Sequence, residues 1–89
     1  MEDVPIPSKE IVSRLKKAEG QLRGIAKMVL EERDCIDIMI QLSATKSALE
    51  SVAALVLQNY TSVCAARSEE ADIGADLARA VSIWIGGRV

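Results

Sequence analysis

The chain has 89 residues, which is enough for one domain, and residues 1–89 are expected to form a single helical unit. Apolar residues make up 49% of the sequence, yet Tyr60 and Trp84 are its only aromatic residues. Such an aliphatic composition is typical of packed helices, so the predicted fold class is all-α. The chain has no histidine, no glycine-rich phosphate loop and no catalytic constellation, so an enzyme is not expected.

So much aliphatic surface on a short chain favours burial between subunits, and we expect an oligomer. The N-terminal segment is acidic and lacks the basic and apolar blocks of an export signal. No apolar run approaches the roughly 18–20 residues of a membrane span, so no membrane partner is expected. Two cysteines without an export signal indicate a reducing cytoplasm, where thiols are more often reactive or metal-binding than structural.

The first predicted helix begins after the segment 5–7, with Ser8 as its N-cap. Apolar residues then recur at alternating spacings of four and three, which is the pattern of an amphipathic helix. These residues are Ile11, Leu15, Ala18, Leu22, Ile25 and Val29. Positions 9 to 27 contain six basic residues and two acidic ones, although the whole chain carries a net charge of −2. Several of these cations lie opposite the apolar stripe, where they form either a solvated surface or a phosphate-binding face. They are Lys9, Lys16, Arg23 and Lys27.

Asp34 is the predicted N-cap of a second helix, and neither glycine nor proline occurs between positions 35 and 73. The apolar period near 3.5 predicts one helix of about thirty residues that ends near Cys64 to Ala66. A third, shorter helix is expected to start at Ser68, where acidic residues follow in its first turn. Its apolar stripe consists of Ile73, Leu77, Val81 and Trp84. Gly86 and Gly87 form its predicted stop signal.

Cys35 and Cys64 are 29 positions apart in the sequence. On one continuous helix this separation is about 44 Å and about eight whole turns, so both thiols are expected on the same face. They cannot meet within one chain, whereas an antiparallel partner helix would place Cys35 of one subunit beside Cys64 of the other. The pair therefore predicts either an intersubunit two-thiol site or two small apolar residues packed in a helix seam.

Three segments, in this order, resemble the copper-sensitive operon repressor (CsoR) family. They are RLKKAEGQLRGI at 14–25, EERDCIDI at 31–38 and QLSATKSAL at 41–49. The resemblance implies a three-helix protomer with one long central helix, an antiparallel homodimer, and a homotetramer built as a dimer of dimers that binds operator double-stranded DNA. It also implies a set of DNA-contacting residues. These are Arg14, Lys16, Lys17, Arg23 and Lys46.

Copper-sensing members of that family use Cys, His and Cys from two subunits as their effector site. Cys35 and Cys64 match the two cysteines, and Tyr60 stands at the position of the histidine. A phenol is a poor ligand for Cu(I), and the branch that keeps both cysteines without the histidine senses persulfides. The resemblance to this CstR-like branch implies a repressor released from DNA when a low-molecular-weight persulfide or polysulfide cross-links Cys35 of one subunit to Cys64 of another. Such a sensor needs no metal or other cofactor.

The alternative is a Cu(I)-sensing repressor that uses the same two thiolates, with Cu(I) as its cofactor. Nickel- and cobalt-sensing relatives use several histidines, and formaldehyde-sensing relatives lack the second cysteine, so both effectors are disfavoured. A helical interaction module with no role in DNA binding is an alternative from a different class. Salt dependence separates these classes, because phosphate binding weakens steeply as salt is added.

Overall fold

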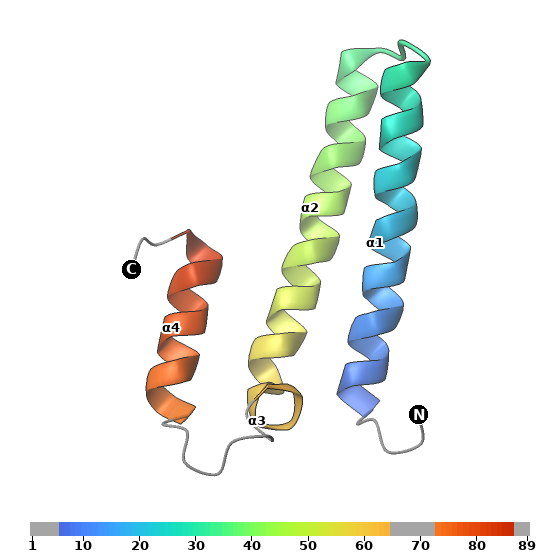
Figure 1. The fold of residues 1–89 in the computed structure, drawn as a ribbon. Helices are drawn as coiled ribbons and strands as arrows, with labels where there is room; N and C mark the ends of the chain where they lie inside the picture. The colour runs from blue at the N-terminus through green and yellow to red at the C-terminus, as the bar shows by residue number, and fades with distance from the viewer. Residues whose placement is uncertain (1–5, 65–72, 87–89) are drawn as a thin grey trace.

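The computed structural model describes residues 6–64 and 73–86, which form four helices (Figure 1). They are α1 (Ile6–Leu30), α2 (Cys35–Gln58), α3 (Tyr60–Val63) and α4 (Ile73–Ile85). α1 and α2 run antiparallel as a long hairpin, and α4 stands beside α2 (Figure 1). The described residues contain no strand, which confirms the all-α prediction.

A narrow apolar seam holds α1 against α2. Ile11, Ala18 and Ile25 are the buried residues of α1, and Thr45 and Val52 are those of α2. Residues seven apart return to nearly the same face after two helical turns, so the three α1 residues form one row along the hairpin. This row positions the two long helices relative to each other.

Only half of the apolar stripe predicted for α1 contributes to this seam. Leu15, Leu22 and Val29, the other half, are between 42% and 56% exposed. Arg14 and Gln21 instead stand beside the buried row on its α2 side, since Gln21 is half-buried and Arg14 bonds to a side chain of α2. The seam therefore includes polar groups, while a second apolar row of α1 faces outward.

The turn between α1 and α2 is a Schellman-type helix ending. The backbone N–H groups of Glu32 and Arg33 donate to the carbonyl oxygens of Val29 and Met28, at 3.1 and 3.0 Å. Glu32 has a φ of 54°, in the left-handed region that glycine adopts most easily. A glutamate at this position carries a conformational cost that the two hydrogen bonds offset.

The starts of the two long helices test two predicted caps. Asp34 is confirmed as the N-cap of α2, because its Oδ1 accepts a hydrogen bond from the N–H of Ile36 at 2.8 Å. The prediction that Ser8 caps the first helix is wrong, because α1 already begins at Ile6. Pro7 lies in the first turn, where its fixed φ and missing N–H are compatible with a helix, so the helix extends past it.

The last helix follows the sequence pattern where the structure describes it. α4 spans the predicted apolar stripe and ends at Gly86, whose φ is 94° and whose N–H donates to the carbonyl oxygen of Ile83 at 3.0 Å. The predicted start at Ser68 lies outside the described residues. None of the described helices combines the length and the apolar character that crossing a membrane requires.

The prediction of one unbroken helix as far as Cys64 is wrong. α2 ends at Gln58, and Asn59 has a φ of −115° and a ψ of 30°. The side-chain Nδ2 of Asn59 and its backbone N–H both donate to the carbonyl oxygen of Leu55, at 2.9 and 3.1 Å. Asparagine side chains compete in this way with backbone N–H groups for helical carbonyl oxygens, and α2 ends at this point. Cys35 and Cys64 therefore do not lie on one straight helix, and the eight-turn register between them does not hold.

Glu32→Gly is expected to stabilise the protein by about 1 kcal/mol, because glycine adopts the left-handed conformation without the steric cost that a β-carbon meets. The free energy of unfolding in urea measures this change. Glu31→Gly is the matched control: Glu31 is adjacent but has no positive φ, so this change should destabilise the protein. A Glu32→Gly variant no more stable than the wild type would contradict the expectation.

Candidate functional site

The two predicted sensing residues are free, exposed thiols at the two ends of the α2–α3 segment. Cys35 is the first residue of α2, and Cys64 directly follows the last residue of α3. The 24 residues of α2 alone span about 36 Å, whereas disulfide-bonded cysteines have α-carbons about 4.4–6.8 Å apart. The two thiols of one protomer therefore cannot share a disulfide or a single bound ion.

Tyr60 lies one helical turn before Cys64. It opens α3 and is half-buried, and its carbonyl oxygen accepts the backbone N–H of Cys64 at 2.8 Å. Asn59 closes the same turn, because its carbonyl oxygen accepts the N–H of Val63 at 2.9 Å and the hydroxyl of Ser62 at 3.1 Å. Among the described residues, no three His, Cys, Asp or Glu side chains gather as a metal-ligand group. Tyr60 and Cys64 are thus joined through their backbones, one helical turn apart, at this end of the protomer.

The five residues predicted to contact DNA do not all line one hollow. Arg14 and Lys17 of α1 line the same hollow between α1 and α2. Arg23 lies farther along α1, and Lys16 is exposed. Lys46 of α2 lines a different hollow, next to α4. The structure thus places Arg14 and Lys17 at one hollow, which none of the other three residues lines.

Ion pairs along α1 neutralise its charge only in part. Arg23 lies 3.7 Å from Glu19, and Lys27 lies 3.9 Å from Glu31. The side chains of both pairs are largely exposed, and such surface pairs contribute about 0–1 kcal/mol, so a phosphate can displace them. Lys16 has no ion pair within the described part of the chain. The helix therefore retains positive charge that a polyanion can reach.

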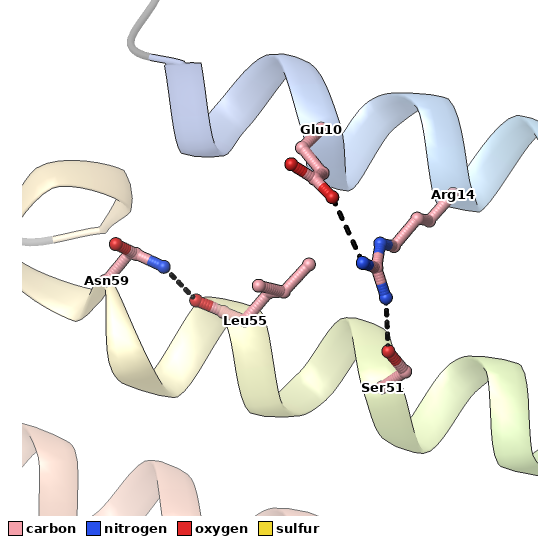
Figure 2. Close-up of polar contacts among 5 residues, drawn as sticks. All are labelled: Glu10, Arg14, Ser51, Leu55 and Asn59. Atoms are coloured by element: carbon pink, nitrogen blue, oxygen red, sulfur yellow. Dashed lines mark hydrogen bonds and ion pairs between the residues drawn. The ribbon is translucent and has the colours of Figure 1, made fainter.

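Arg14 joins α1 to α2 at the surface (Figure 2). Its Nη1 donates to the hydroxyl oxygen of Ser51 on α2, and its Nη2 donates to Oε1 of Glu10 at 3.0 Å. The side chain of Arg14 is 44% exposed and that of Glu10 is 52% exposed. The guanidinium group is therefore held in place by a hydroxyl, partly neutralised by a carboxylate, and open to solvent.

The residues around Arg14 were not predicted from the sequence. Glu10 and Gln21 follow from helix spacing alone, because each lies four residues from one member of the basic pair, whereas Ser51 joins that pair only through the pairing of α1 with α2. One further signal was available, because Arg14 and Gln21 are seven residues apart, the spacing of the buried apolar row of α1, and each follows a residue of that row by three positions. Two polar residues at that spacing mark a polar stretch inside the seam. No sequence signal of this kind identifies Ser51.

The larger hollow, of about 580 Å³, lies between the α1–α2 hairpin and α4 and is mostly apolar. Four of its lining side chains are between 40% and 76% exposed. They are Leu22 of α1, Leu42 of α2, and Trp84 and Ile85 of α4. Exposed apolar surface that gathers in this way is typical of protein interfaces.

Known proteins share this sequence pattern. The profile of a family described as "metal-sensitive transcriptional repressor" matches residues 8–84. The copper-sensing transcriptional repressor RicR of Mycobacterium tuberculosis is 48% identical over 64 residues, which cover 71% of this chain and 67% of RicR. The copper-sensing transcriptional repressor CsoR of Bacillus subtilis is 44% identical over 57 residues, which cover 64% of this chain and 56% of that protein.

A third relative, the copper-sensing transcriptional repressor CsoR of Mycobacterium ulcerans, is 42% identical over 53 residues, which cover 60% of this chain and 45% of that protein. The matched segments thus span from under half to two thirds of the relatives' own lengths. No solved structure gives a significant match. All three relatives are regulators of transcription and not enzymes.

Proposed function

Because the chain belongs to the family of metal-sensitive transcriptional repressors, we propose that it binds operator DNA in the cytoplasm and loses this affinity when Cys35 of one protomer is bridged to Cys64 of another. The observation that carries the proposal is the placement of two exposed thiols at opposite ends of the α2–α3 segment. Since one protomer cannot bring them together, an effector that uses both must link two chains.

DNA binding is assigned to the basic side of α1. Arg14 is preoriented by Ser51, and Lys17 lines the same hollow, so two cations are directed to one place on the surface. Lys16, Arg23 and Lys46 add positive charge elsewhere on the protomer. Clustered cations raise the local potential even on a chain with a net negative charge, and they release counterions when they bind phosphates.

Cu(I) is the first candidate effector. The relatives are named copper-sensing, and thiolates are the soft ligands that Cu(I) prefers. Cys35 of one protomer and Cys64 of another would hold the ion, and Cu(I) would supply a soft cation that links the two chains without any change of oxidation state. The phenol of Tyr60 is a hard oxygen ligand, so it is left out of this site.

A persulfide is the second candidate, and the chain's own composition favours it: Tyr60 replaces the expected imidazole and no histidine occurs anywhere. One cysteine thiolate attacks the outer sulfur of glutathione persulfide, and glutathione thiolate leaves. The second thiolate then attacks the protein-bound inner sulfur and displaces hydrosulfide, which leaves an intersubunit disulfide. Two thiolates are oxidised and the outer sulfur is reduced, so the reaction needs no other oxidant.

Both effectors require a second copy of the chain. The outward row of Leu15, Leu22 and Val29, together with the apolar hollow beside α4, is the surface that we assign to this contact. We propose an antiparallel dimer, because that arrangement brings the start of α2 in one protomer beside the end of α3 in the other. We also propose that such dimers pair into a tetramer. A bridge at Cys64 acts on α3, which joins α2 at Asn59, and so shifts the population away from the DNA-binding arrangement.

Replacing Arg14 with Ala is expected to weaken DNA binding and to reduce the slope of log affinity against log salt by about one per protomer in contact with DNA. Fluorescence anisotropy at several KCl concentrations measures this, with a labelled duplex that the wild type has selected from a random pool. Arg79→Ala, which removes an exposed cation from α4, is the matched control and should change the slope less. If the affinity of the wild type for the duplex did not change with salt concentration, the alternative of a helical interaction module with no role in DNA binding would be favoured.

The effector is identified by treating the reduced protein, bound to that duplex, with Cu(I) or with glutathione persulfide. Cu(I) is expected to release DNA without a covalent dimer, whereas persulfide should give a dimer, in intact-mass spectra without reductant, that reductant reverses. Cys35→Ala and Cys64→Ala should each abolish this release of DNA.

Tyr60→His should strengthen Cu(I) binding and leave the persulfide reaction unchanged, because imidazole ligates copper well. If either cysteine variant released the duplex as fully as the wild type does after treatment with an effector, the two-thiol bridge would be refuted.

Leu22→Glu is expected to dissociate the oligomer, because it places a charge in the outward apolar row. Light scattering should show the particle mass falling toward the 9.6 kDa of one chain. Ser13→Glu adds the same charge at an exposed polar position of α1 and should keep the wild-type mass. If Leu22→Glu left the particle mass unchanged, the contact between copies of the chain would have to lie on another surface.

A further inference from the structure

The smaller hollow, between α1 and α2, has a volume of about 240 Å³. It is lined by Arg14, Lys17 and Gln21 of α1 and by Ala48 and Ser51 of α2. Pockets for drug-sized ligands measure about 300–1,000 Å³, so this hollow suits a smaller group. Two of its five lining residues carry positive charge, and two more carry polar groups that can donate a hydrogen bond. The lining therefore fits a small anion.

The hollow follows from the helix pairing. Arg14, Lys17 and Gln21 are three and four residues apart, so they lie on one face of α1. Ala48 and Ser51 are three residues apart on the facing side of α2. The short side chains of this α2 pair leave the space that the longer side chains of α1 surround.

Gln21 has hydrogen-bonding capacity that the described residues do not use. Its Oε1 atom is buried and has no hydrogen-bond partner among them. A buried polar atom without a partner is costly, and a group bound in the hollow would remove this cost. Rotation of the carboxamide exchanges its oxygen with its NH₂ group, so the same side chain can donate to an anion.

The other polar groups are also incompletely used. Ser51 accepts the hydrogen bond from Arg14, so its own hydroxyl hydrogen remains to be donated. Arg14 has five N–H groups and directs one to Ser51 and one to Glu10. Lys17 has no ion pair within the described residues. An anion in the hollow would therefore meet donors from both helices.

We infer that this hollow is a seat for a single phosphate group, and that Glu10 is the anion that the phosphate displaces from Arg14. The inference rests on the proposed function in one respect, because a phosphodiester of the DNA backbone is the source that a repressor meets. Free inorganic phosphate offers the same chemistry. With Glu10 in place the carboxylate neutralises Arg14, and with Glu10 displaced both cations face the phosphate.

Two substitutions test the seat on DNA. Glu10→Gln removes the competing charge and should raise the affinity for the selected duplex by about threefold, in line with an exposed ion pair. Ser51→Ala removes a donor and should lower that affinity by about fivefold. Glu19→Gln is the matched control, because Glu19 and Arg23 form the same i,i+4 pair on the same helix outside the hollow. Equal effects of Glu10→Gln and Glu19→Gln would overturn the inference.

A titration with inorganic phosphate tests the seat without DNA. The Nε–H resonance of Arg14 should shift to saturation in sodium phosphate and not in sodium chloride of equal ionic strength, and Ser51→Ala should weaken the response. If phosphate titrates Arg14 but no duplex binds, the seat stands and the proposed repressor function fails. If the duplex binds while phosphate leaves Arg14 unchanged and both substitutions leave affinity unchanged, the repressor stands and the seat is wrong.

Discussion

The packing of α1 on α2 through Ile11, Ala18 and Ile25 determines where the functional side chains lie. The row buries little apolar surface for a chain of this size, and small domains depend on such burial for their stability. It also fixes the face of α1 that meets α2, so Arg14 reaches Ser51 and the hollow beside them stays open. The same rotation of α1 leaves its second apolar row exposed, and this row is the surface to which we assign contact with a second copy of the chain.

The sequence pattern predicted the two long helices and α4, together with the cap at Asp34 and the stop at Gly86. It could not predict which half of the α1 stripe meets α2. Both rows repeat every seven residues, and the alternating four and three spacing is the same whether a helix packs within its own chain or against another. The break at Asn59 also escaped prediction, because it depends on side-chain hydrogen bonding to Leu55 and carries no glycine or proline signal.

The candidate site shows the same division between local pattern and tertiary pairing. The resemblance to known repressors pointed to the two cysteines and to basic residues of both long helices as a set. The structure separates that set, since Arg14 and Lys17 share one hollow while Lys46 lines the apolar one. The roles of Ser51 and Gln21 arise only when two helices meet, and neither residue type identifies a binding site by itself.

The distance between the two thiols links the proposed sensing chemistry to the abundance of the protein. Within the proposed antiparallel pair, Cys35 of one chain and Cys64 of the other would lie at a high effective concentration, so one effector would react with or bind both thiols. In a dilute, dissociated chain the same thiols remain exposed but act separately, and oxidants or ions leave two independent single-site adducts. How much repressor a cell maintains would therefore determine which product the same chemical signal gives, so the copy number of the protein becomes part of its response threshold.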